Sequence, residues 1–162
     1  MPLHFGYGSN ISLAKLQADM LRPLPGEPPP VPGALDPGRV AHIRGYRLGV
    51  RSANGTATIV PTRDPADRVY GVLYDLTDDQ FERLRINEGL SSPMIDVEAY
   101  SGDGVSVAVS WIWPESDDPA QPIARYYMEL MIEAGRARGF PPEYSDGVLA
   151  PLTRERARFK AF

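Results

Sequence analysis

The chain has 162 residues, the length of one domain (1–162), and its 43% hydrophobic and 23% charged residues are ordinary for a globular protein. The net charge is −4 and the basic residues are scattered, which disfavours nucleic acid as a partner, while the lack of cysteine excludes thiol nucleophiles, disulfides and cysteine-bound metals. No apolar run approaches the roughly 20 residues that a membrane span needs and no signal peptide is visible, so we expect a cytoplasmic protein without a membrane partner.

A strand, a glycine turn and a helix are predicted at the start of the sequence. Apolar residues alternate at positions 3, 5 and 7, which indicates a short strand. Gly8, Ser9 and Asn10 form the turn, and apolar residues at 13, 16 and 20 then recur with helical spacing. Asn10 and Ser12 are both candidate N-caps of this helix.

A proline-rich stretch follows at 23–37 and contains seven of the 17 prolines. It is predicted to be an extended surface connector rather than an SH3-type ligand. It is not expected to be a domain boundary, because the 22 residues before it are too few to fold alone.

Strand patterns accumulate from residue 40 onward. The alternation at 46, 48 and 50 predicts one strand, and the β-branched run 56–60 predicts another after the turn pair Asn54-Gly55. The runs 69–76 and 94–100 predict two more strands. The segment 105–113 alternates cleanly, and one of its faces carries three valines and two tryptophans: Val105, Val107, Val109, Trp111 and Trp113.

Two further helices are predicted, at 77–88 and at about 120–138. The second has an apolar stripe of Ile123, Tyr127, Leu130, Met131 and Ala134, and it ends at Gly139. Together these elements predict an α+β fold, with a curved, mostly antiparallel sheet, open or closed into a small barrel, and about three helices.

The helix at 77–88 carries a carboxylate on its apolar side. Thr77 and Gln80 have the spacing of a capping box. On a helical wheel, Glu88 projects within about 20° of Phe81, which belongs to the inward face. Partial burial and the negative end of the helix dipole should both raise the pKa of Glu88. Two other interpretations are open: Glu88 pairs with Arg85, or it extends from the last turn into solvent.

The turn FGYGSN (5–10) is a candidate anion site. Small residues between a strand and a helix N-terminus leave several backbone N–H groups free. The missing lysine disfavours a nucleoside triphosphate, so a single carboxylate or another small anion would fit better. A plain tight turn is the alternative.

The sequence offers few other groups for catalysis. It contains two histidines, His4 and His42, too few for a three-histidine zinc site, and no HExxH, GxSxG or GxxxxGK[ST] pattern. Each histidine is more typical of a structural residue than of a catalyst. Any chemistry is therefore expected to depend on carboxylates, hydroxyls and the backbone.

Five stretches, in order along the chain, resemble the γ-glutamylcyclotransferase family, which includes the AIG2-like proteins and the enzyme that trims γ-glutamyl groups in butirosin biosynthesis. They are YGSN at 7–10, GTATIVP at 55–61, VYGVLYDL at 69–76, NEG at 87–89 and RYYMELMIEAGRARGFPPEY at 125–144. The resemblance runs over about residues 3–150. YGSN alone is a weak signal, whereas the five stretches in sequence are specific.

The resemblance implies a small mixed, mostly antiparallel β-barrel with flanking helices, and no metal or organic cofactor. It implies that Glu88 is the acid/base. It further implies that the α-amino-acid end of a γ-glutamyl substrate is held by Tyr7, Gly8, Ser9 and Asn10, with Tyr127 near the pocket. Asn10 departs from the leucine of the glutathione-specific branch. Ile95 stands where several relatives carry a tyrosine, which leaves the polarity of that side of the pocket open.

The implied reaction converts the γ-glutamyl group of a small γ-glutamyl amine or amino acid into 5-oxoproline and releases the free amine. The expected partner is this small substrate, and the expected assembly is a monomer or homodimer. Two alternatives remain at this point. The chain could be a non-catalytic AIG2-like protein that binds a small ligand or a partner chain, or it could carry out acyl transfer or hydrolysis on a γ-glutamylated metabolite.

Overall fold

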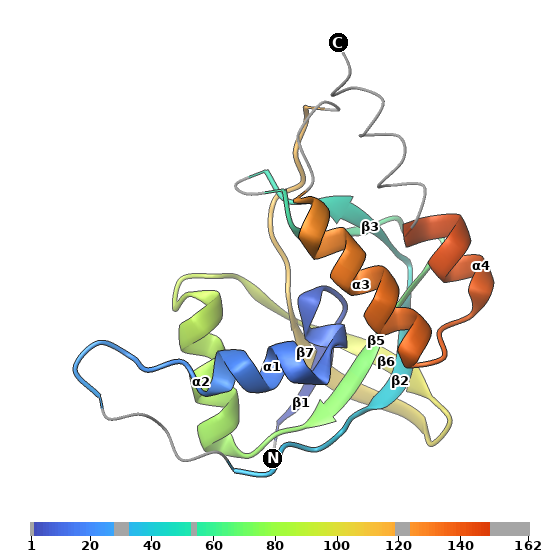
Figure 1. The fold of residues 1–162 in the computed structure, drawn as a ribbon. Helices are drawn as coiled ribbons and strands as arrows, with labels where there is room; N and C mark the ends of the chain where they lie inside the picture. Colours follow the sequence, from blue (N-terminus) through green and yellow to red (C-terminus); the bar gives the residue numbers. More distant parts are fainter. Residues whose placement is uncertain (1, 28–32, 53–54, 119–123, 150–162) are drawn as a thin grey trace.

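A closed β-barrel forms the centre of the computed structural model, which describes residues 2–27, 33–52, 55–118 and 124–149 (Figure 1). Its strands, in the order in which they pair around the barrel, are β1 (Leu3–Gly6), β5 (Arg68–Asp75), β2 (Arg39–Arg44), β6 (Met94–Ser101) and β7 (Gly104–Trp111). β1 and β7 close the barrel with a parallel pairing, and every other neighbouring pair is antiparallel. The α+β class and the mixed, mostly antiparallel barrel are therefore confirmed.

A separate two-stranded sheet lies beside the barrel. It pairs β3 (Tyr46–Val50) with β4 (Ala57–Pro61) in antiparallel register. Gly55 has a φ of +69°, as expected in a tight turn, while Asn54 of the predicted turn pair lies outside the described residues. The proline-rich stretch is likewise described only in part, because 28–32 fall outside the described ranges.

Most predicted strands are found within one or two residues of their predicted bounds, but β2 was not assigned from the sequence. In β2 the side chains of Ala41 and Ile43 are buried, whereas His42 and Arg44 on the alternate positions are not. The pattern is too short and too polar to stand out, and its strand state depends on pairing with both β5 and β6.

The first two helices begin where side chains cap their N-termini. α1 (Leu13–Met20) begins after Ser12, whose Oγ accepts a hydrogen bond from the Lys15 N–H at 3.3 Å, so Ser12 and not Asn10 is the N-cap. α2 (Asp78–Glu88) has both hydrogen bonds of the predicted capping box between Thr77 and Gln80.

The predicted start of the third helix is wrong. α3 (Arg125–Ala137) begins after Ala124, which has extended backbone angles, and 120–123 lie outside the described residues. Three short elements complete the described chain: the 3-10 helix η1 (Ser9–Ile11), α4 (Pro142–Tyr144) and the π-helix η2 (Ser145–Leu149). Figure 1 shows α1 and α2 together on one side of the barrel, with α3 above them.

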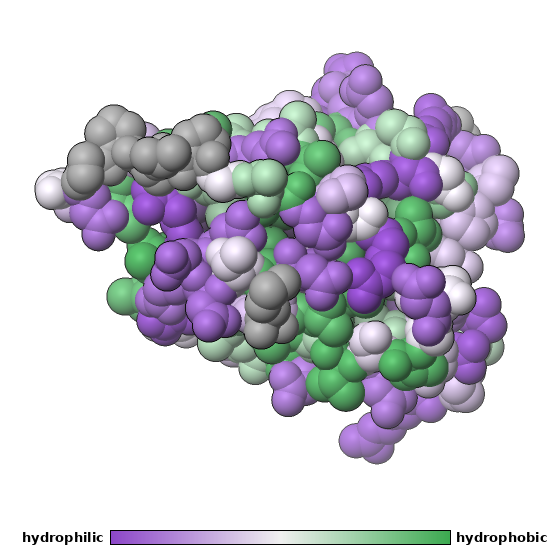
Figure 2. Space-filling view, turned by 90° about the horizontal axis from the view of Figure 1, so that it is seen from below, coloured by the Kyte–Doolittle hydropathy of each residue, from purple (hydrophilic) through white to green (hydrophobic). Residues whose placement is uncertain are grey.

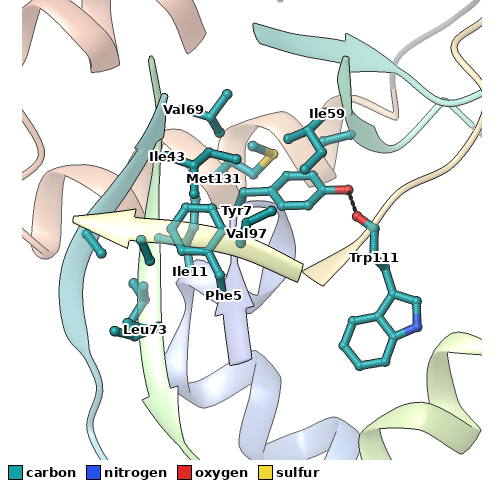
Figure 3. Close-up of a cluster of buried hydrophobic side chains, with 14 of the residues drawn as sticks. Phe5, Tyr7, Ile11, Ile43, Ile59, Val69, Leu73, Val97, Trp111 and Met131 are labelled. Atoms are coloured by element: carbon teal, nitrogen blue, oxygen red, sulfur yellow. Dashed lines mark hydrogen bonds between the residues drawn. The ribbon is translucent and has the colours of Figure 1, made fainter. Parts of the chain in front are cut away.

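The barrel interior combines a few large side chains with several small ones. Figure 3 shows Phe5, Ile43, Val69, Leu73 and Val97 gathered in the buried cluster. The cross-strand register places small residues on the same face: Ala41 opposite Gly71, Ile43 opposite Ala99, and Val97 opposite Ala108. A five-stranded barrel has little internal room, so large and small side chains must alternate across it.

The valine face of β7 points away from this interior. Val105 and Val107 are 57% and 64% exposed, while the smaller Ala108 and Ser110 are buried. At the far end of the same face Trp111 is covered, because Phe81 of α2 stacks on it with ring centroids 6.0 Å apart. The alternation in the sequence was therefore right, but it did not show that small residues occupy the inside of so narrow a barrel.

Seen from below, the surface is largely hydrophilic, with hydrophobic residues in separate groups between hydrophilic ones (Figure 2). Within the part of the chain that the structure describes, no helix has the length and apolarity of a membrane span.

Gly71→Ala is expected to destabilise the barrel by about 1–3 kcal/mol, because the interior cannot accept another methyl group. A Cβ at Gly71 would lie 2.5 Å from the backbone oxygen of Gly6 and 2.6 Å from Cζ of Phe5. Urea unfolding measures the change. Gly102→Ala is the control, since no atom lies within 4 Å of its added Cβ. Equal stability of the two variants would contradict the close packing of β1 against β5.

Candidate active site

A cavity of about 300 Å³ opens beside the end of β1, where the chain leaves the barrel and turns into η1. Every residue of the segment 4–10 lines it, together with the last turn of α2 and the first turn of α3. The rest of the lining comes from α1 and Arg22 after it, from β7 and the residues after it, and from the β3–β4 hairpin. All the predicted site residues line this one cavity: Tyr7, Gly8, Ser9, Asn10, Glu88 and Tyr127.

Glu88 lies in the last helical turn of α2 and faces the glycine turn, residues 7–10. Its Oε1 accepts a hydrogen bond from Nδ2 of Asn10 at 3.5 Å. Burial raises the pKa of the Glu88 carboxyl above its ordinary value, and the negative charge of Asp19 acts in the same direction. The hydrogen bond from Asn10 opposes this effect, as do the positive charges of Arg51 and Lys15. The net pKa is raised, which keeps the proton of this carboxyl exchangeable nearer to neutral pH.

The interpretation that Glu88 pairs with Arg85 is wrong. Arg85 instead donates two hydrogen bonds to Glu82, from Nε at 2.8 Å and from Nη2 at 2.7 Å. The interpretation that Glu88 extends into solvent is wrong as well, because its carboxylate contacts buried Asn10. The end of the helix is fixed by Ser92, whose hydroxyl donates to the backbone oxygen of Glu88 at 2.6 Å. Among the described residues, Glu88 forms no salt bridge.

The glycine turn is held against α3 by the hydroxyl of Tyr127. This hydroxyl accepts a hydrogen bond from the Ser9 N–H at 3.3 Å. Gly8 lies so close that a Cβ on it would collide with the same hydroxyl, which explains the glycine. Burial raises the pKa of Tyr127 to about 12, so it stays protonated at neutral pH.

Tyr7 and Asn10 connect the turn to the barrel. The Tyr7 hydroxyl donates to the backbone oxygen of Trp111 at 2.8 Å, as Figure 3 shows. The Tyr74 hydroxyl donates to the backbone oxygen of Asn10 at 2.7 Å. Both residues therefore have a fixed position, and the Asn10 side chain is 7% exposed.

His4 was expected to be structural, yet it lies in the cavity wall. Its Nδ1 is 3.2 Å from the backbone oxygen of Val109, which can only accept, so Nδ1 carries the proton. Its Nε2 then accepts from Nδ2 of Asn10 at 3.5 Å. Burial lowers the pKa of His4 to about 4, so the ring is neutral at pH 7. A chain of contacts thus runs from His4 through Asn10 to Glu88 and orients the Asn10 amide.

Ile95 is not among the residues that line the cavity. It pairs with Ser110 in the β6–β7 register and packs partly buried against the core. Ser110, which does line the cavity, donates its hydroxyl proton to the Phe5 backbone oxygen at 2.8 Å. No cluster of three or more histidine, aspartate or glutamate side chains suited to a metal ion is present among the described residues.

No family model and no curated protein sequence matches the chain, but several solved structures share its fold. A structure described as a γ-glutamyl cyclotransferase superposes with a TM-score of 0.68 at 19% identity, covering 99% of this chain and 98% of the other. An uncharacterized human protein gives a TM-score of 0.66 at 21% identity, with 91% and 85% covered. YkqA from Bacillus subtilis gives 0.68 at 18% identity, with 94% of this chain but 54% of YkqA covered.

The chain therefore has the γ-glutamyl cyclotransferase-like fold. At these identities the likeness establishes the fold alone, because one fold can carry unrelated activities. Activity has to be argued from the side chains that line the cavity.

Proposed function

We propose that the chain is a γ-glutamyl cyclotransferase, which closes the γ-glutamyl group of a small substrate to 5-oxoproline and releases an amine. One observation carries the proposal. Glu88, a carboxylate without a salt-bridge partner among the described residues and with a raised pKa, faces a turn of small residues across one cavity. A carboxylate of this kind is suited to take up a proton and to return it.

The cavity suits a small substrate with a carboxylate. Its volume of about 300 Å³ lies at the lower end of the range for small-molecule sites. We assign the substrate's α-carboxylate to the turn at 7–10, where backbone N–H groups can bind an anion. Tyr127 would assist, because it lines the cavity and its hydroxyl, which accepts from the Ser9 N–H, stays protonated at neutral pH.

The reaction requires a base first and an acid afterwards. The α-ammonium group of the substrate has no lone pair, so Glu88 takes one of its protons. The resulting amine attacks the γ-carbonyl carbon of the same molecule and forms a five-membered ring. The bond from this carbon to the leaving nitrogen then breaks, and Glu88 returns its proton to that nitrogen. The ring nitrogen also gives up its second proton, which the released amine takes up, so that the products are 5-oxoproline and an ammonium ion. Attack within one molecule supplies much of the rate once the cavity has folded the substrate.

Asn10 affects these proton transfers through its hydrogen bond to Glu88. Its amide donates to Oε1, which stabilises the charged carboxylate and keeps the pKa from rising further. His4 holds the same amide from the other side. We therefore assign Asn10 a role in positioning the base as well as in binding the substrate.

Incubation with a panel of γ-glutamyl amino acids and γ-glutamyl amines tests the proposal. The expected result is 5-oxoproline and free amine in equal amounts, which chromatography measures. Free glutamate in place of 5-oxoproline would indicate a hydrolase, and transfer of the γ-glutamyl group to a second amine would indicate acyl transfer. Binding without any product would favour a non-catalytic ligand-binding protein.

A further inference from the structure

Arg51 is a preorganised cation in the cavity wall. It follows β3 directly, and its guanidinium carbon lies 4.3 Å from the ring centroid of Trp113. The backbone of Trp113 is itself fixed: its backbone N–H donates to Oγ1 of buried Thr58 at 2.9 Å, and that hydroxyl donates to the Trp113 backbone oxygen at 2.8 Å. Contact between a guanidinium and an aromatic ring leaves N–H groups free to donate to a carboxylate.

Arg51 also gives the side chains that line the cavity an excess of positive charge. The other two cations among the described lining residues, Lys15 and Arg22, both pair with Asp19, the second pair at 3.1 Å. Glu88 supplies the only other carboxylate among these residues. When it is ionised, the lining residues carry one more positive charge than negative, and when it is protonated they carry two more. Among the described residues, Arg51 forms no ion pair.

The two ends of the substrate, the head group and the leaving group, differ in net charge. The γ-glutamyl head group carries an ammonium and a carboxylate, so it is neutral overall. In a γ-glutamyl amine with an uncharged leaving group, the leaving group adds no charge to the substrate. A γ-glutamyl amino acid adds one carboxylate, on the carbon that is attached to the scissile nitrogen. Its single negative charge complements the excess positive charge of the cavity.

We propose that Arg51 binds the carboxylate of the leaving amino acid, so that the substrates are γ-glutamyl amino acids rather than γ-glutamyl amines. This assignment rests on the proposed function, since it identifies the leaving group of that reaction. Trp113 contributes by holding the guanidinium in place and by offering an apolar surface to the leaving side chain. The glycine turn and Arg51 thus recognise the two carboxylates of one substrate.

Two matched substrates test the assignment: γ-glutamylalanine, and γ-glutamylethylamide, which lacks only the alanine carboxylate. The wild-type kcat/KM is expected to favour γ-glutamylalanine by roughly 10- to 100-fold, the range for a charge-assisted hydrogen bond. Arg51→Gln should remove this preference by lowering kcat/KM for γ-glutamylalanine alone. Arg51→Lys should retain part of it, because the charge remains while the planar fork is lost.

Arg44→Gln is the matched control. Arg44 also lies over an aromatic ring, 4.1 Å from the centroid of Tyr100, but does not line the cavity. The same change of charge there should leave the substrate preference intact. An equal loss for both substrates in Arg51→Gln would overturn the assignment, because Arg51 would then hold the head-group carboxylate that both share. An unchanged preference would overturn it as well.

Calorimetric titration of both compounds into Glu88→Gln protein separates this proposal from the proposed function. If the wild type releases no 5-oxoproline, the proposed function fails, while tighter binding of γ-glutamylalanine that depends on Arg51 would still support the carboxylate site. If both compounds bind equally, the carboxylate site fails even where turnover is found. Binding of neither compound would overturn both proposals.

Discussion

Glu88→Gln is expected to lower 5-oxoproline release by about 10²- to 10⁴-fold, roughly 3 to 5.5 kcal/mol in activation free energy. Glutamine has nearly the same shape and can still accept the hydrogen bond that Asn10 donates to Glu88 at 3.5 Å. It cannot accept the proton of the substrate's ammonium group. Substrate binding should survive, because the turn at 7–10 is unchanged.

The same variant should be as stable as the wild type or more stable near pH 7, since a neutral amide replaces a partly buried charge. The difference has a defined pH dependence. Because folding raises the pKa of Glu88 above its ordinary 4.5, the folded state binds a proton that the unfolded state releases. Wild-type stability therefore falls as pH rises from 4.5 through the raised pKa. The advantage of the glutamine variant should be smallest below pH 4.5 and level off above the raised pKa.

Glu82→Gln is the matched control on the same helix. Glu82 pairs with Arg85 on the exposed side of α2 and does not line the cavity. Its replacement should leave 5-oxoproline release unchanged. Turnover and melting temperature, measured on both variants, decide the role of Glu88: near-normal turnover with a lowered melting temperature would remove it from the mechanism.

Acetylation of the substrate's α-amino group is expected to abolish 5-oxoproline formation entirely. In the acetylated compound the nitrogen lone pair is delocalised into an amide, so it cannot attack the γ-carbonyl carbon. The measurement is 5-oxoproline and free amine from the acetylated and free forms of the same γ-glutamyl amino acid. Release of the amine from the acetylated form would show hydrolysis by water and would overturn the cyclisation mechanism.

A β-aspartyl analogue provides a second comparison, because it keeps the free amine and shortens the chain by one carbon. Its ring would have four members, so cyclisation should fail although the amine remains nucleophilic. The two analogues thus separate the need for a nucleophile from the need for the right ring size. Turnover of the aspartyl compound would contradict a reaction set by ring closure.

Much of the fold could be predicted because its elements are specified locally. The capping box of Thr77 and Gln80 fixes the start of α2, and the spacing of seven positions from Phe81 to Glu88 fixes the direction of the carboxylate on the helix. The small residues at 8–10 indicated a turn able to approach a ligand. These inferences need no knowledge of the rest of the chain, and in the structure the carboxylate and the turn line one cavity.

His4 and Arg51 show what local patterns do not contain. A histidine in a strand can face solvent, core or cavity, and only the contact of His4 with Val109, 105 residues away, places it beside Asn10. Nothing in the sequence distinguishes Arg51 from the other arginines. Only the fold places its guanidinium over the ring of Trp113. The strand β2 was missed for a similar reason, since its pairing with β5 and β6 outweighs its weak pattern.

The parallel pairing of β1 with β7 also sets the order in which the site can assemble. β1 lies between β5 and β7, so the first strand of the chain gains its second neighbour only when a segment more than a hundred residues later arrives. Closing so long a loop costs conformational entropy before the strands can pair. Contacts between residues far apart in the sequence therefore slow folding. The glycine turn that follows β1 therefore has no cavity to line until the last strand docks. Folding intermediates that lack β7 should be inactive even where α2 and its glutamate have already formed.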